Sequence, residues 1–190
     1  TVAAIAGDRT SAARARDRVL QREVDSHAQA IEEEFDRSRV VILLTAHNPA
    51  FREFYELPGT REQRLAAGGP VVDQVHDALR YLEQLYPART LDEVCFIHGT
   101  GAENARVVAQ RLAPTDDLSQ DETANAFFGP TIGMRVGEVY QAAPYRSPDT
   151  GQWVISTSTP LDTGQESAIL HFEIDLETFR QALGSTTAAH

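Results

Sequence analysis

The sequence of 190 residues is poor in cysteine, methionine and tryptophan, with one of each, and it contains no lysine. The single cysteine, Cys95, excludes an internal disulfide framework and a zinc site built from several cysteines. The 17 basic residues are outnumbered by 28 acidic ones, which gives a net charge of −11. Nucleic acid is therefore not an expected partner, because binding phosphates requires clustered positive charge. No run of about 18 apolar residues occurs, so no membrane-spanning segment is predicted.

Hydrophobic residues make up 42% of the chain, enough for a core that folds without covalent cross-links. The sequence begins at Thr1, and its one methionine is Met134. We expect a processed chain or a piece of a longer parent. Residues 1–9 are interpreted as a membrane-proximal stub, which could be the end of a spanning helix or a processing scar.

Residues 10–86 are predicted to be helical. A long helix is expected from Ser11 to Ala46, capped by Thr10 or Ser11 and stopped by Asn48-Pro49. Helical spacing places one apolar stripe along it: Val24, Ala28, Ile31, Phe35 and Ile42. Shorter helices are predicted around residues 51–55 and from Pro70 to Tyr86, the latter ended by Pro87. A long surface helix of a bundle is the alternative interpretation of this region.

Beyond Pro87 the hydrophobic period changes to two, which predicts strands over residues 94–97, 104–108, 138–142, 153–159 and 168–174. Residues 113–132 are predicted to be a loop with short helical pieces. A closing helix is expected over 176–183 and a tail over 184–190. Helices followed by an antiparallel meander define an α+β fold.

No catalytic constellation stands out. Asp-Thr-Gly occurs at residues 149–151 and 162–164, but strand spacing keeps the two apart, so both are interpreted as turns rather than as an aspartic-protease pair. His98-Gly99-Thr100-Gly101 lacks an accompanying Gly-x-Ser-x-Gly and is interpreted as a hairpin turn. The six histidines show no metal-binding spacing, and Cys95 is interpreted as a core residue. We therefore predict no metal site, no cofactor and no catalytic residue.

The strand at 168–174 has two different faces. Leu170, Phe172 and Ile174 alternate with Ile169, His171 and Glu173. If both faces are covered, the Glu173 carboxylate requires a partner, and a ligand cation would serve. The alternative is a sheet with Glu173 in water.

Several segments together resemble the Cache (PDC, extracytoplasmic PAS-like) sensor domains. The first is a helix, a strand and the pattern Gly-x-Glu-x-x-Arg-Val at residues 101–107. The others follow in order: residues 116–128, 137–145, 149–151, 153–161 and 172–176. The resemblance covers most of residues 10–183 and is strongest over 81–176.

This resemblance implies a long N-terminal helix on an antiparallel PAS-like sheet in a single lobe, residues 87–183. It also implies an extracytoplasmic domain of a membrane receptor, such as a histidine kinase, a diguanylate cyclase or a chemoreceptor. Tyr145 and Glu173 match a ligand-contacting tyrosine and acid of the amino-acid-binding branch. That branch's carboxylate-binding arginine has no counterpart near Phe127 and Phe128, and Ser147 replaces an aspartate.

We therefore predict a sensor without catalytic activity. Its ligand-binding residues are expected to be Tyr145, Glu173, His171, Phe127, Phe128, Trp153 and Tyr140, with Arg106 or Arg135 as the anchor if the ligand is an acid. The expected partners are a small molecule and a second copy of the chain, bound through the N-terminal helix. The alternatives are a dimerisation module with an empty lobe, and a hydrolase that pairs Glu173 with Asp116 or Asp121. The stripe of the long helix is expected to contact Leu170 and Phe172.

Overall fold

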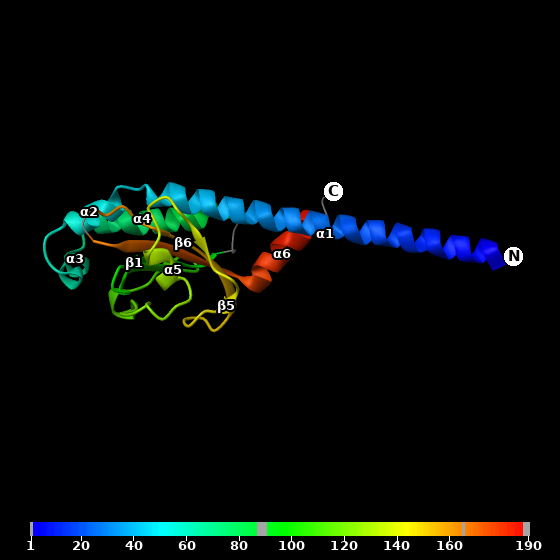
Figure 1. Ribbon diagram of the computed structural model, residues 1–190. Coiled ribbons are helices and arrows are strands. Elements are labelled where there is room, and N and C mark those ends of the chain that lie inside the picture. The colour runs from blue at the N-terminus through cyan, green and yellow to red at the C-terminus, as the bar shows by residue number, and fades with distance from the viewer. Residues whose placement is uncertain (1, 87–90, 165, 188–190) are drawn as a thin grey trace.

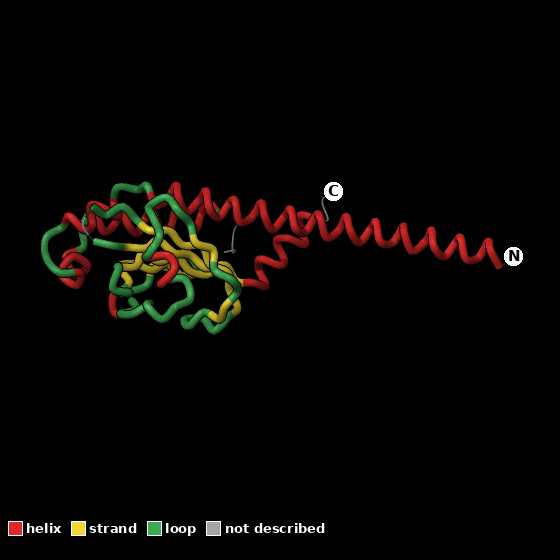
Figure 2. The backbone as a smooth tube through the Cα atoms, viewed as in Figure 1, coloured by secondary structure: helices red, strands yellow, loops and turns green. Residues whose placement is uncertain are grey.

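A computed structural model describes residues 2–86, 91–164 and 166–187, and it places a sheet between a layer of helices and a layer of loops (Figure 1, Figure 2). The helices are α1 (Val2–Ala46), α2 (Ala50–Glu56), α3 (Arg61–Ala67), α4 (Pro70–Leu85), α5 (Phe128–Ile132) and α6 (Leu176–Thr187), with a 3-10 turn, η1, at Thr115–Asp117. The strands are β1 (Leu91–His98), β2 (Glu103–Val108), β3 (Arg111–Leu112), β4 (Tyr140–Gln141), β5 (Tyr145–Arg146), β6 (Trp153–Pro160) and β7 (Ala168–Asp175).

The sheet is antiparallel, and its strand order is β3-β2-β1-β7-β6-β4, with β5 on the same edge of β6. The hairpin β1–β2 turns at Gly99 and Gly101, as the sequence predicts. However, the predicted meander is wrong, because the first strand pairs with the last, β7, at the centre of the sheet. This pairing joins segments about 75 residues apart, which local alternation cannot reveal.

The α+β fold, with a long N-terminal helix on an antiparallel sheet, is confirmed. Ile42 of α1 lies in the same buried cluster as Leu170 and Phe172, while Ile31 and Phe35 pack on its margin. Helices α2 and α4 contribute Phe51, Phe54, Val75, Leu79 and Leu82 to that cluster. The alternating apolar residues of the strands thus face the helices.

Several predicted boundaries differ from those observed. Helix α1 begins at Val2 rather than near Ser11, and its residue Val24 is 60% exposed because the helix projects beyond the sheet (Figure 1). The strand predicted at 138–142 is reduced to β4, and helix α6 continues to Thr187 through most of the predicted tail. Pro87 and residues 188–190 lie outside the described residues.

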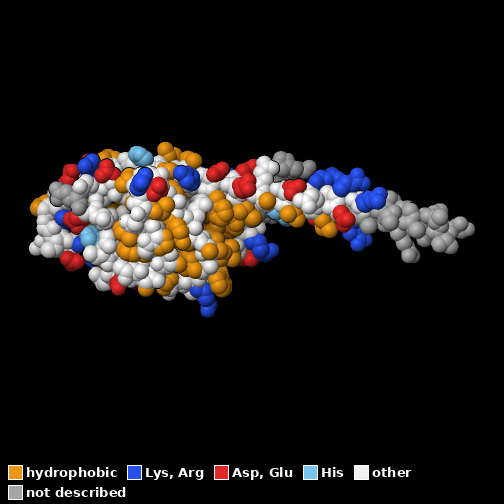
Figure 3. Space-filling view, viewed as in Figure 1, with side chains coloured by type: hydrophobic (Ala, Val, Ile, Leu, Met, Phe, Trp, Pro, Cys, Tyr) orange, Lys and Arg blue, Asp and Glu red, His pale blue; other side chains and the backbone are white. Residues whose placement is uncertain are grey.

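No helix among the described residues is both long enough and apolar enough to cross a membrane. From Arg14 onward, the part of α1 that projects beyond the sheet carries exposed acidic and arginine side chains (Figure 3).

Candidate functional site: a buried polar face of the sheet

The face of the sheet opposite the helices carries polar side chains at its centre. In the β1–β7 pairing, Glu93 lies opposite Glu173, and Cys95 lies opposite His171. Cys95 also pairs with Arg106 of β2. The same face continues on β6 with Ser156 and Ser158, which pair with Glu173 and His171. All of these residues are buried: Glu93, Cys95, Arg106, Ser156, Ser158, His171 and Glu173.

Residues 113–150 cover this face with loops, η1, α5 and two short strands (Figure 2). The Phe127 ring stacks on the His171 imidazole, with centroids 3.5 Å apart. Phe127 and Phe128 form a second apolar cluster with Cys95, and the Tyr140 and Tyr145 side chains pack at its edge. Thr131 of α5 hydrogen-bonds Ser158 through their hydroxyl groups at 2.9 Å. The covering segment therefore excludes water from the polar groups.

Glu173 is surrounded by hydrogen-bond donors. The Tyr145 hydroxyl donates to its Oε1 at 2.5 Å, and His171 Nε2 lies 3.5 Å from the same oxygen. Burial by itself would raise the pKa of Glu173, but His171, Tyr145 and Ser147 favour the carboxylate and hold the pKa below its ordinary value. The pKa of Tyr145 is raised, first by burial and then by the charge of Glu173. The site thus contains a buried carboxylate.

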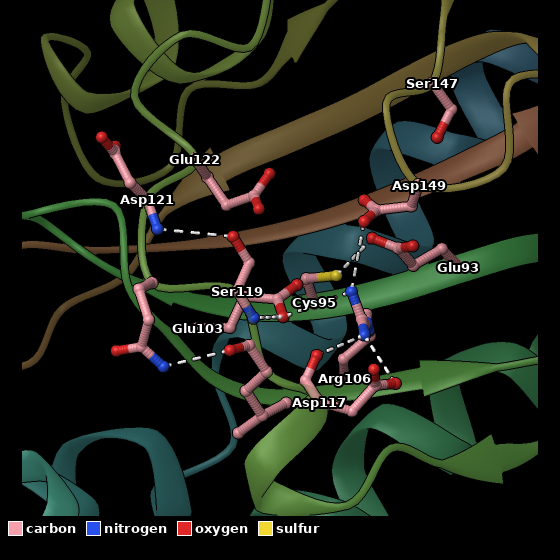
Figure 4. Close-up of polar contacts among 12 residues, drawn as sticks. Glu93, Cys95, Glu103, Arg106, Asp117, Ser119, Asp121, Glu122, Ser147 and Asp149 are labelled. Atoms are coloured by element: carbon pink, nitrogen blue, oxygen red, sulfur yellow. Dashed lines mark hydrogen bonds and ion pairs between the residues drawn. The ribbon is translucent and has the colours of Figure 1, made fainter.

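A second group of carboxyls lies on the neighbouring strands. The Cys95 thiol donates to Glu93 Oε1 at 2.7 Å, and the Ser119 backbone N–H donates to Glu103 Oε2 at 2.7 Å (Figure 4). Burial is the main reason that the pKa of Glu93 is raised to about 8 and that of Glu103 to about 7. Burial likewise raises the pKa of the Cys95 thiol.

Arg106 links this group to the cover (Figure 4). Its Nη2 donates to the carboxylate of Asp117 at 3.0 Å and to the backbone oxygen of that residue at 2.7 Å. Its Nη1 lies 3.4 Å from Asp149 and 3.5 Å from Glu103. The guanidinium thus holds η1 and the turn before β6 over the sheet.

Several buried polar atoms on this face have no hydrogen-bond partner. They are Glu93 Oε2, Glu103 Oε1, Arg106 Nε, Ser156 Oγ, His171 Nδ1 and Glu173 Oε2. Burying such atoms unpaired costs about 1–3 kcal/mol each, and more for charged groups. Within the described residues, these polar groups of the face therefore lack a protein partner.

The structure brings six of the seven predicted ligand-binding residues to this face or its cover: Tyr140, Tyr145, Phe127, Phe128, His171 and Glu173. Trp153 is the exception. It alternates with Val154 on β6, points to the other side of the sheet, and is 55% exposed beside Phe179. Trp153 therefore does not join the other six on the polar face. Of the two arginines considered, Arg106 belongs to the face and Arg135 is exposed on the cover.

Sequence analysis missed Glu93 and Glu103 as site residues. The alternation of Glu93, Cys95 and Ile97 along one strand was a usable signal, since these three share a face. Asp116 and Asp121, the acids of the hydrolase alternative, are both exposed on the covering loop. Asp121 there accepts hydrogen bonds from the backbone and hydroxyl of Thr123.

Three surface pockets of the described residues lie away from this face. One groove of about 1060 Å³ runs between the end of α1 and α4, lined by residues that include Leu44, Tyr81 and Leu85. The other two lie beside Pro160 and beside Trp153.

No protein-family model matches the sequence, and no curated protein matches it. Solved structures, however, share the fold. The extracellular domain of vpHK1S-Z8, described as a histidine kinase, superposes with a TM-score of 0.62 at 12% identity. A domain of a sensory box/GGDEF family protein from Vibrio parahaemolyticus gives 0.63 at 13% identity. Each comparison covers 88% of this chain and 62% of the other.

The ligand-binding domain of the Pseudomonas fluorescens chemoreceptor CtaA, solved with L-serine, gives a TM-score of 0.54 at 16% identity. This match covers 82% of the chain and 57% of that domain. The chain therefore spans about three fifths of the length of the structures it resembles. The chain shares its fold with these domains of receptors, which is the fold that the resemblance in the sequence implies.

Proposed function

We propose that this chain is the extracytoplasmic ligand-sensing domain of a transmembrane receptor and that a small molecule binds on the buried polar face. The parent would be a histidine kinase, a diguanylate cyclase or a chemoreceptor. The observation that carries the proposal is the set of unpartnered polar atoms under a loop cover. The shared fold supports it.

The chemistry of the face favours a ligand with a positively charged or hydrogen-bond-donating group. The lowered pKa of Glu173 keeps it ionised, and its Oε2 has no partner. The stacked Phe127 and His171 rings next to it offer an aromatic surface to a cation. An amine placed there would satisfy the carboxylate that Tyr145 holds on its other oxygen.

Thermal-shift measurements with amines, amino acids and organic acids test this proposal. A ligand at 100 times its Kd stabilises the fold by about 2.7 kcal/mol, which raises the melting temperature by about 5–10 °C. We expect amine-bearing compounds to produce this shift in the wild type and not in Glu173→Gln. Glu83→Gln, which alters a buried carboxyl on α4, should respond like the wild type.

If acids without donors are the compounds that stabilise the fold, Glu173 is not the anchor, and Arg106 takes that role. If no compound stabilises the fold, the alternative of a dimerisation module gains support. A turnover that is lost in both Glu173→Gln and Asp121→Asn would overturn the sensor assignment in favour of a hydrolase.

We also propose that two copies associate through α1. Most of the exposed large hydrophobic side chains in the described part of the chain lie on α1 and α4: Val19, Leu20, Val24, Val40, Leu44, Tyr81 and Leu85. A second copy covering them would remove this apolar surface from water. The groove between the two helices gives this surface a defined shape.

A further inference from the structure

Three side chains with metal-ligating atoms converge between β1 and β2. They are Glu93, Cys95 and Glu103, whose ligand atoms lie within 4.8 Å of one another (Figure 4). All three are buried, Glu103 completely. Glu93 and Cys95 are two residues apart on one strand, and Glu103 comes from the adjacent strand, so the pleat directs them to one point.

In both Glu93 and Glu103, one carboxyl oxygen accepts a hydrogen bond and the other has no partner. Glu103 Oε2 accepts the Ser119 N–H and faces Arg106, whereas Glu103 Oε1 has no partner. Glu93 Oε1 accepts the Cys95 thiol, whereas Glu93 Oε2 has no partner. Hydrogen bonds to the second oxygen are the kind of support that orients metal-ligating carboxylates.

The face is rich in carboxyl groups, which can bind a cation once they lose their protons. Four buried carboxyl groups, those of Glu93, Glu103, Glu122 and Glu173, share this side of the described structure with the guanidinium of Arg106. That guanidinium is already engaged by Asp117 and Asp149. A divalent ion bound by these carboxyls would take the place of their protons and balance the charge of the carboxylates that form.

We propose that Glu93, Cys95 and Glu103 form a binding site for a thiophilic divalent metal ion of the zinc class. Zinc bonds of about 2.0 Å to oxygen and about 2.3 Å to sulfur place tetrahedral ligands about 3.3–3.5 Å apart. Side-chain movements of at most about 1.5 Å therefore bring the three atoms into position. The thiolate selects zinc or cobalt over magnesium and calcium, which prefer oxygen ligands alone.

Metal binding replaces the Cys95 thiol proton and the protons on the Glu93 and Glu103 carboxyls, and these protons leave to solvent as the three atoms coordinate the ion. The three protein ligands leave one tetrahedral position for water or for a donor atom of another molecule. The site lies beside the Glu173 carboxylate, because Glu93 and Glu173 are paired across the strands. It does not depend on the amine-binding proposal.

Cobalt titration of the metal-free, reduced chain tests the proposal. Cys95 is the only cysteine in the sequence, so a thiolate-to-cobalt charge-transfer band reports on this site alone. We expect a band that saturates at one cobalt per chain and disappears when zinc is added. Glu103→Gln and Glu93→Gln should each weaken cobalt binding at least tenfold, since even outer contacts of metal ligands contribute 10–100-fold.

Glu83→Gln is the matched control, because Glu83 is a buried carboxyl on α4 away from the three ligands. Its cobalt affinity should remain within twofold of the wild type. A separate measurement does not depend on folding of the glutamine variants: zinc should raise the melting temperature of the wild type and leave that of Cys95→Ser unchanged.

Three results would overturn the proposal. The first is the absence of a charge-transfer band. The second is a band whose affinity is unchanged in both glutamine variants, which would mean that the thiol binds cobalt by itself. The third is equal zinc stabilisation of the wild type and Cys95→Ser, which would place the metal elsewhere.

Discussion

The Tyr145 hydroxyl makes the shortest described contact with the Glu173 carboxylate, and we expect this hydrogen bond to contribute to stability. Tyr145→Phe removes this donor and leaves a buried charge with less compensation. The loss of this hydrogen bond should lower the free energy of unfolding by about 1–3 kcal/mol, as for other hydrogen bonds to buried charged groups. Urea unfolding followed by circular dichroism measures the change.

Tyr140→Phe is the control for this variant. Tyr140 packs at the edge of the same apolar cluster, and its side chain is half-buried. The Tyr140 variant should change the unfolding free energy by less than about 0.5 kcal/mol. Equal losses in the two variants would contradict the role assigned to the Tyr145–Glu173 hydrogen bond.

We expect the stability of the fold to depend on pH through the Glu83 carboxyl on α4. Its Oε1 accepts the backbone N–H of Gln110 at 2.7 Å, in the turn between β2 and β3. Burial raises the pKa of Glu83, and this hydrogen bond opposes the shift without cancelling it. Folding therefore favours the protonated form, so this group's stabilisation is full below its unfolded pKa and is lost as pH rises through the folded pKa.

The isosteric variant Glu83→Gln keeps an acceptor for the Gln110 N–H and does not ionise. We expect the wild type and the variant to differ least below about pH 4. As pH rises above about 4.5, the wild type should lose stability relative to the variant and then level off. Chemical denaturation of both proteins between pH 4 and 8 measures this difference, and a constant difference would contradict the assignment.

At the residue scale, alternation along the last strand predicted two residues of the candidate site. His171 and Glu173 were assigned to the face opposite the apolar residues of that strand, and the structure places them so, because the apolar residues lie in the core beneath the helices. Trp153 was named as a candidate wall of the site without an assigned face, and its position on β6 directs it to the side of the sheet that the helices cover. Glu103 was missed because its neighbours on β2 give no clear alternation, and a register shift follows Phe96.

At the scale of elements, the half-buried aromatic residue Phe35 joins α1 to α6. The Phe35 ring stacks on Phe179 of α6 with centroids 6.0 Å apart, and its backbone oxygen accepts the Gln141 side chain. Phe35→Asp places a charge in this contact. We expect a loss of about 1–3 kcal/mol, measured as a lower melting temperature.

Val24→Asp is the matched control, since Val24 lies on the same helix and is 60% exposed. It should leave the melting temperature of the monomeric lobe unchanged. If Phe35→Asp melts at the wild-type temperature, α1 and α6 are not coupled through this contact.

The sequence predicts the helices more completely than it predicts which strands pair. Pro70 at the start of α4 and its stripe of Val75, Leu79 and Leu82 are local features of the sequence, and the helix forms as expected. The pairing of β1 with β7 depends on contacts between distant segments, which no local pattern contains. The missed helix α3 begins with a capping box of Thr60 and Gln63, which is a recognisable local signal.

At the scale of the whole molecule, the polar face lies on one side of the sheet and the terminal helices lie on the other. The covering loops lie on one side, while α1 packs on the other and projects beyond the lobe beside α6 (Figure 1). In the proposed function, the covering loops can take two positions, and the ligand binds one of them more tightly. Binding then favours that position, and the sheet and the two helices move with the loops. The size of that shift is limited by the ligand's differential affinity for the two states.

We expect two chains to associate through α1. Leu44 is 66% exposed on α1 and lines the groove shared with Tyr81 of α4. Leu44→Arg places a charge where a second copy would pack, and it should weaken the dimer at least tenfold without lowering the melting temperature of the monomer. Sedimentation equilibrium at several protein concentrations measures the association. Val136→Arg, an equally exposed apolar position on the covering segment, should leave it unchanged. A monomeric wild type, or equal weakening by both variants, would contradict association through this surface.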